Sequence, residues 1–179
     1  MHLLEALAAH VAYDEEEARA LEQIRAFVAE ERRCFDRTLP AGHVTGSAWV
    51  LDHGRRYVLL THHRKLDLWL QLGGHAENED DVVAVASREA LEESGLARIE
   101  LVSEAIFDVD VHAIPARGDE PFHLHYDVRL CFLGDRRARL RASSESREIA
   151  WFALGAVAGL KTDASVLRMV RKSADRRFG

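Results

Sequence analysis

The sequence has few of the residues that would mark a disulfide-stabilised, collagen-like or disordered protein. Its 179 residues include only three prolines and only two cysteines, Cys34 and Cys131. The cysteines lie far apart beside apolar or aromatic neighbours, which favours a small hydrophobic role in a reducing compartment. Residues are 47% hydrophobic and 30% charged, without repeats or low-complexity tracts. This composition predicts a folded globular domain.

Long hydrophobic runs and an excess of positive charge are also missing. No stretch approaches the roughly 20 apolar residues that a membrane-spanning helix needs. The N-terminal segment is too acidic for a signal peptide. The formal net charge of -6 argues against non-specific binding to nucleic acid or anionic membranes, which depends on clustered Lys and Arg. We therefore expect a cytoplasmic protein that binds neither nucleic acid nor membrane, and the choice between a monomer and a homodimer stays open.

Three segments have a helical pattern or composition. They are Leu3–Ala29, Asn78–Gly95 and about Thr162–Lys172. In the first, apolar residues recur at intervals of three and four, which predicts two short helices or one interrupted helix, with Asp14 available as a cap. Thr162 or Asp163 is expected to cap the last helix.

Runs of β-branched and aromatic residues, separated by turn residues, predict strands between these helices. The predicted strands are His43–Asp52, Arg55–His63, Asp67–Gly74, Ile99–Ile114, Phe122–Phe132 and Glu148–Phe152. The first two are expected to pair antiparallel. Strands on both sides of one central helix predict an α+β domain with mixed sheets. A helical segment, residues 1–38, is expected to pack on a main domain, residues 39–179.

Three glutamates lie close together on the predicted central helix. At about 100° per residue, Glu89, Glu92 and Glu93 share an arc of about 100°, and the small and apolar residues around Ala90 fall on the opposite arc, which separates the acidic face from the packing face. Val82 and Val85 project towards the glutamate side, so we expect the N-terminal end of the helix to be covered on both sides. Three neighbouring carboxylates repel one another, and a divalent ion removes that conflict. Carboxylate oxygens suit Mg²⁺ or Mn²⁺, which can also bind substrate phosphates. A solvated acidic face is the alternative, and helical spacing alone leaves both open.

The segment around these glutamates resembles the Nudix box, G-x5-E-x7-R-E-U-x-E-E-x-G-U, in which U is a bulky aliphatic residue. The matching residues are Gly74, Asp80, Arg88, Glu89, Ala90, Glu92, Glu93, Gly95 and Leu96. Two positions depart from the pattern, because Asp80 replaces Glu and Ala90 replaces the bulky aliphatic residue. These departures bear on local packing and on the support of Arg88, whereas the metal-binding glutamates are intact. Gly95 is expected to end the helix in a left-handed conformation.

The resemblance implies an α/β/α sandwich, with mixed sheets around a central catalytic helix and the N-terminal helices as additions. It also implies a pyrophosphohydrolase in which water attacks a phosphorus of a nucleoside diphosphate linked to another group. Glu89, Glu92, Glu93 and the backbone carbonyl of Gly74 would hold Mg²⁺ or Mn²⁺. Glu89 could instead be the general base. Arg88 would anchor the loop or orient a glutamate.

Basic residues and histidines outside the helix are further candidates. Arg64 and Lys65 precede the paired glycines and could neutralise a diphosphate, with His75 just beyond them, although a solvated hairpin end explains the basic run equally well. His75 and the pair His123 and His125 lack enough further ligands at suitable spacing for zinc. The sequence therefore predicts no zinc site.

The identity of the base, the substrate and two other functions stay open. A base from a distant loop, as some family members use, would be Glu120, Glu145 or Glu148. The box does not define which diphosphate is cleaved. A sensor that binds a nucleotide without cleaving it is one alternative, and a prenyl-diphosphate isomerase is another. The isomerase would need a cysteine acid-base group, and neither Cys34 nor Cys131 lies in a recognisable context for one.

Overall fold

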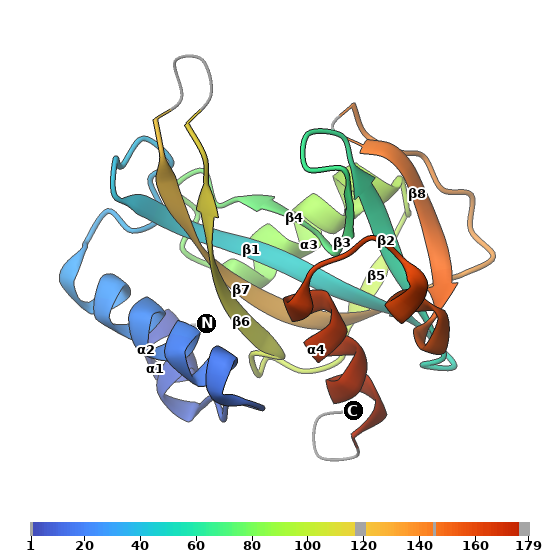
Figure 1. Ribbon diagram of the computed structural model, residues 1–179, viewed down its shortest axis with the longest axis horizontal. Helices are drawn as coiled ribbons and strands as arrows, with labels where there is room; N and C mark the ends of the chain where they lie inside the picture. Colours follow the sequence, from blue (N-terminus) through green and yellow to red (C-terminus); the bar gives the residue numbers. More distant parts are fainter. Residues whose placement is uncertain (1, 117–120, 145, 176–179) are drawn as a thin grey trace.

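A computed structural model describes residues 2–116, 121–144 and 146–175. In these residues eight strands form one curled mixed sheet, whose main path runs β3-β2-β1-β7-β5 (Figure 1). The strands are β1 Gly42–Asp52, β2 Tyr57–His63, β3 Leu68–Leu70, β4 Leu72–His75, β5 Ile99–Leu101, β6 Asp108–Ile114, β7 His123–Gly134 and β8 Ser146–Ala153.

Strand β1 is the centre of the sheet and divides its pairing along its length. It runs parallel to β7 from Gly42 to Asp52. On its other edge the first half of β1 pairs with β4 and the second half with β2, both antiparallel. Strand β7 divides in the same way, between β6 and β5. The central pair of β1 and β7 is therefore flanked by β4 and β6 at one end and by β2 and β5 at the other.

Two predicted strands are each divided in the structure. The predicted strand Ile99–Ile114 is wrong as a single element, because β5 and β6 pair with opposite ends of β7 and the chain must cross between them. The predicted strand Asp67–Gly74 is divided at Gln71, because β3 pairs with β2 whereas β4 pairs with β1. The antiparallel pairing of β1 with β2 is confirmed, but over a short stretch around Val50 and Leu59.

The helices are α1 Leu3–Ala9, α2 Glu15–Glu30, α3 Val82–Ser94 and α4 Ala164–Ala174, with a 3-10 helix, η1, at Leu154–Gly159. Asp14 caps α2 by accepting a hydrogen bond from the amide of Glu17, as predicted. Asp163 caps α4. Helix α3 begins later than predicted, after its cap Asp81. None of the helices in the described part of the chain is long and apolar enough to cross a membrane.

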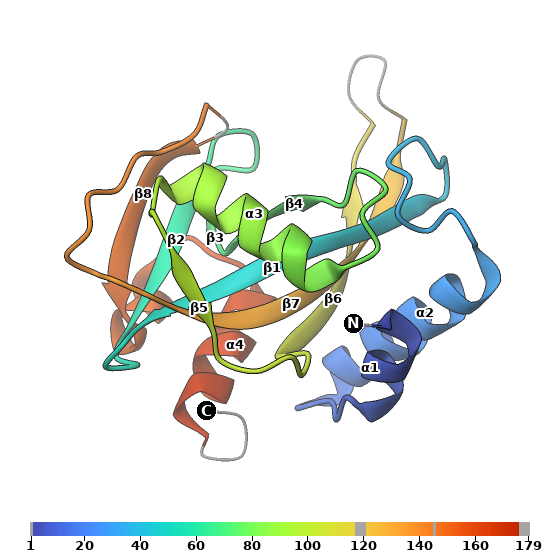
Figure 2. The ribbon, with the colours of Figure 1, turned by 180° about the vertical axis from the view of Figure 1, so that it is seen from behind.

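Helices cover both faces of the sheet (Figures 1 and 2). Alternate side chains of β1 point to opposite faces. Val44, Ala48 and Val50 enter one core together with residues of α2 and α3. Trp49 and Leu51 enter a second core, on the side of α4. The expected sandwich of helices around a mixed sheet is confirmed.

Buried charges join α2, β6 and α4. The ammonium group of Lys172 on α4 forms an ion pair with Glu17 on α2, lies 3.0 Å from the carboxylate of Asp108 on β6, and donates to the carbonyl of Phe107. Asp108 also accepts from Arg129 and Arg168. Because these side chains are almost completely buried, each charge depends on its partners for the solvation that water would supply.

Candidate functional site

Helix α3, which carries the three glutamates, lies beside β4 (Figure 2). Its buried residues are Val82, Val85, Ala86, Ala90 and Ser94. At about 100° per residue these span an arc that includes the direction of Glu93. The predicted packing arc is confirmed at Ala90 and Ser94, and burial of Val82 and Val85 shows that the glutamate side is also covered at the N-terminal end of the helix. The predicted separation of the acidic face from the packing face is wrong at Glu93, which contacts β4.

Glu89 is held against the backbone of β4. Its side chain is 16% exposed. A Cβ atom at Gly74 would lie 2.4 Å from Oε2 of Glu89, so the glycine leaves the space that the carboxylate occupies. Burial raises the pKa of the Glu89 carboxyl above its ordinary value, while the charge and hydrogen bond of Arg88 act in the opposite direction.

Glu93 and Glu92 have different surroundings. The carboxylate of Glu93 accepts a hydrogen bond of 3.0 Å from the backbone amide of Gly73. Glu92 is 64% exposed, with one oxygen 3.7 Å from the guanidinium of Arg88. Glu89 and Glu93 are thus fixed to the Gly73–Gly74 segment, whereas Glu92 faces solvent.

Arg88 connects the helix to the end of β4. Its guanidinium donates to Oε1 of Glu89 at 2.6 Å and to the backbone carbonyl of His75 at 2.9 Å. Helix α3 ends at Gly95, which has a left-handed φ of 69°, as predicted. The carboxylates and their backbone partners are therefore positioned by one arginine, one pair of glycines and the cap of the helix.

The other predicted site residues lie in separate places. Arg64 donates to the backbone carbonyls of Ser144 and Ser146, at 3.2 and 3.0 Å. Lys65 is exposed in the turn after β2. Glu148 is exposed on β8, opposite His62. The remaining two base candidates, Glu120 and Glu145, lie outside the described residues.

His75 lies in a group of histidines from distant parts of the sequence that were not predicted to be close together. Its ring centroid lies 5.0 Å from that of His43 and 5.2 Å from that of His125. His43 was missed because its spacing from the other histidines is large. The sequence could show that His43 shares one face of its predicted strand with Thr45 and Ser47. It could not show that β1 pairs in parallel with β7, which places His43 opposite His125.

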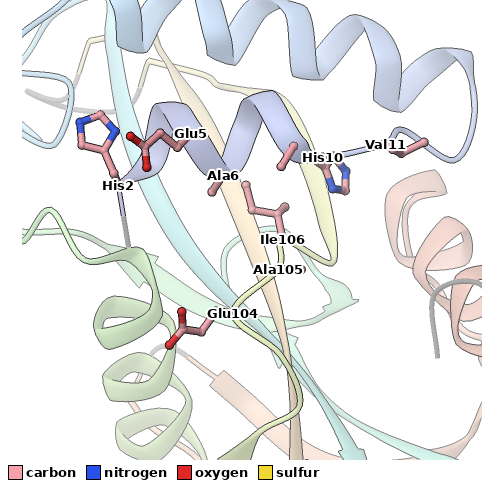
Figure 3. A pocket seen from close by; sticks show the side chains of 9 residues that line it. His2, Glu5, Ala6, His10, Val11, Glu104, Ala105 and Ile106 are labelled. Atoms are coloured by element: carbon pink, nitrogen blue, oxygen red, sulfur yellow. The ribbon is translucent and has the colours of Figure 1, made fainter.

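A cavity of about 560 Å³ lies away from the glutamates, between α1 and the segment Glu104–Ile106 (Figure 3). The residues that line it include Glu5, Ala6 and Ala9 of α1, and Glu104 from the facing segment (Figure 3). None of its described lining residues belongs to α3 or β4. This cavity is therefore separate from the glutamates of α3.

Comparisons with known proteins agree with the fold and with the box. The family model described as NUDIX domain matches residues 41–171. No curated protein matches the chain.

Solved structures with the same fold share little sequence with this chain. An Ap4A hydrolase binary complex from C. elegans is 15% identical, with a TM-score of 0.58, over 73% of this chain and 94% of that chain. A NUDIX-family hydrolase from Clostridium perfringens is 21% identical, with a TM-score of 0.53, over 73% and 95%. The NUDIX domain of Shewanella oneidensis NrtR, complexed with ADP ribose, is 16% identical, with a TM-score of 0.53, over 86% and 97%.

Proposed function

The chain belongs to the NUDIX family, and we propose that it is a metal-dependent pyrophosphohydrolase that cleaves a nucleoside diphosphate linked to another group. The observation that carries the proposal is the packing of Glu89 and Glu93 against the Gly73–Gly74 segment. A solvated acidic face would not require a glycine backbone in contact with one carboxylate and an amide donating to another.

The residues at this site fit a hard divalent cation. Glu89, Glu92 and Glu93 supply anionic oxygens within two turns of one helix, and Gly74 brings a backbone carbonyl to the same edge. Oxygen ligands of this kind suit Mg²⁺ or Mn²⁺ rather than softer metals. Such an ion, when bound, lowers the pKa of a water ligand and offsets negative charge on phosphate oxygens.

The chain's own groups would position the reactants and accept a proton. Arg88 holds Glu89 and the His75 carbonyl in fixed relation, so the carboxylate needs little reorganisation when substrate binds. Glu89 is largely buried, and one of its oxygens would take the proton of the attacking water while the other keeps its hydrogen bond from Arg88. Glu92 is 64% exposed, so a substrate could approach it from solvent.

A nucleotide sensor without turnover is the second candidate function. The similarity to the NrtR domain that was crystallised with ADP ribose motivates it, although a likeness at 16% identity bears on the fold alone. Two features favour the enzyme instead. All three helical glutamates of the box are present, and two of them are anchored to β4.

A substrate screen separates these functions. The protein, freed of metal and then supplied with Mg²⁺ or Mn²⁺, is incubated with nucleoside diphosphate derivatives that include ADP-ribose and Ap4A. Products are separated by chromatography, and binding of each compound is measured in parallel. Metal-dependent cleavage of at least one compound supports the hydrolase. Tight binding without any cleavage across the panel would overturn it in favour of the sensor.

A further inference from the structure

Five histidines from four strands meet on the sheet face opposite the glutamates. His43 on β1, His75 on β4, His112 on β6, and His123 and His125 on β7 have ring centroids 4.7–5.3 Å from their neighbours in the group. The strand register produces this group, because His43 and His112 both pair with His125.

The group is separated from the glutamates by the sheet itself. Successive side chains of a strand point to opposite faces. A Cβ atom at Gly74 would point at Glu89, so the next residue, His75, points away from α3. His75 accordingly contacts the rings of His43 and His125. The carboxylate site therefore does not explain why these histidines gather.

His43 provides an independent sign of a ligand at this place. His43 is only 1% exposed, and neither of its ring nitrogens has a hydrogen-bond partner within the described part of the chain. A buried polar group without a partner costs roughly 1–3 kcal/mol, and native structures contain few of them. A bound ion would supply the missing partner for one of the two nitrogens.

His123 is already oriented as a metal ligand would be. Its Nδ1 lies 2.9 Å from the backbone carbonyl of Pro121. A carbonyl only accepts, so Nδ1 carries the proton and Nε2 keeps its lone pair. That Nε2 faces Nε2 of His125 at 3.2 Å. Two nitrogens on a tetrahedral zinc ion, each at about 2.0–2.1 Å, would be roughly 3.3 Å apart.

We propose that His43, His123 and His125 bind a divalent transition metal ion of the zinc type, separately from the carboxylate site. One ring nitrogen from each of the three lies within 4.8 Å of the others, so small side-chain rotations bring all three to one ion. Imidazole nitrogens suit Zn²⁺, Co²⁺, Ni²⁺ or Cu²⁺ and bind Mg²⁺ poorly. The sequence predicted no zinc site at His123 and His125 because too few further ligands lay at suitable spacing. In the fold, His43 on β1 lies beside them as a third ligand.

The surroundings keep the rings in the form that binds metal. Burial, together with the neighbouring imidazoles, lowers the pKa of His43 to about 4 and that of His125 to about 2. Both rings are therefore neutral at physiological pH. An ion held by β1 and β7 would connect the two central strands and stabilise the folded state by mass action.

Metal titration of the untagged full chain tests the proposal. The probe is Co²⁺, whose visible absorption reports a tetrahedral nitrogen site, followed by displacement with Zn²⁺. The test variant is His123→Gln with His125→Gln, and the matched control is His53→Gln, at an exposed turn. We expect the wild type and the control to bind one Co²⁺ with visible absorption, and the test variant to bind on the order of 100-fold more weakly.

Two further measurements make the outcome decisive. Glu92→Gln with Glu93→Gln should leave the Co²⁺ absorption unchanged, because the two sites share no ligand. Imidazole ¹⁵N shifts of the wild-type protein need no variant, and Zn²⁺ should move the Nε2 resonance of His123. The proposal is overturned by Co²⁺ affinity that survives in the His123/His125 variant, by absorption lost instead in the glutamate variant, or by unmoved histidine resonances under saturating Zn²⁺.

Discussion

The carboxylate of Glu89 occupies space that a side chain at Gly74 would fill. A Cβ atom at Gly74 would lie 2.4 Å from Oε2 and 2.6 Å from Cδ of Glu89. Non-bonded contacts this close are essentially never made by a real Cβ atom, so the carboxylate would have to move. This relationship couples the first residue of the box to the helix that follows it, and it gives the glycine a role that does not depend on backbone conformation.

Gly74→Ala should therefore disturb activity more than folding. The added methyl group displaces Glu89 from its contact with Arg88 and from its position at the β4 edge. A displacement of about 1 Å at a reacting group costs up to roughly 100-fold, so we expect kcat/KM to fall by about 10- to 100-fold. Steady-state kinetics measure this change. The matched control is Gly155→Ala, where no other described residue comes within 4 Å of the added atom, apart from its own neighbours in the chain. Equal activities of the two variants would contradict the account.

Arg88→Lys tests the positioning role of the guanidinium. Lysine keeps the charge but cannot donate to Glu89 and to the His75 carbonyl in the same fixed geometry. We expect kcat to fall about 10-fold or more, with little change in thermal stability. Arg98→Lys, at an exposed position, is the control and should retain full activity. If Arg88→Lys matches that control, Arg88 does not position the site.

Glu17 links acid sensitivity to the buried charges between α2 and α4. Burial alone would raise the pKa of Glu17, but hydrogen bonding to His10 and the charge of Lys172 outweigh burial and hold the pKa at about 2. The folded pKa thus lies below the ordinary value of 4.5. The ionised group therefore stabilises the fold above about pH 4.5, and this contribution is lost as the pH falls towards about 2.

Glu17→Gln should lower the free energy of unfolding by about 3 kcal/mol near neutral pH, because it leaves Lys172 buried with one carboxylate fewer. Urea unfolding of this variant, of the wild type and of Glu16→Gln, whose side chain is exposed, measures the effect. The difference from wild type should shrink in acid, whereas Glu16→Gln should follow wild type throughout. A deficit that stays constant down to about pH 3 would refute the assigned pKa.

Local signals in the sequence predicted much of the fold. The caps Asp14 and Asp163, the end of α3 at Gly95 and the antiparallel pair β1 and β2 each depend on residues close together in the chain. The match to the Nudix box also identified the helix that carries the glutamates, because all the matching residues lie within one short segment of the chain.

Features that depend on distant pairing were not predictable in this way. Residues Ile99–Ile114 form two strands because β5 pairs with the last part of β7 and β6 pairs with its first part. Helical periodicity placed Glu93 away from the packing face, but β4 covers that side of α3 as well. His43 meets His123 only through the parallel pairing of β1 with β7.

The central claim is that the glutamates of α3 hold the metal that hydrolysis requires. Its most direct test is kcat/KM as a function of Mg²⁺ or Mn²⁺ concentration, on the best compound from the substrate screen. Glu92→Gln with Glu93→Gln is compared with Glu100→Gln, an exposed glutamate on β5. We expect the double variant to lose on the order of 100-fold or more and to need more metal, while the control behaves as wild type. Unchanged turnover and unchanged metal dependence in the double variant would contradict the account.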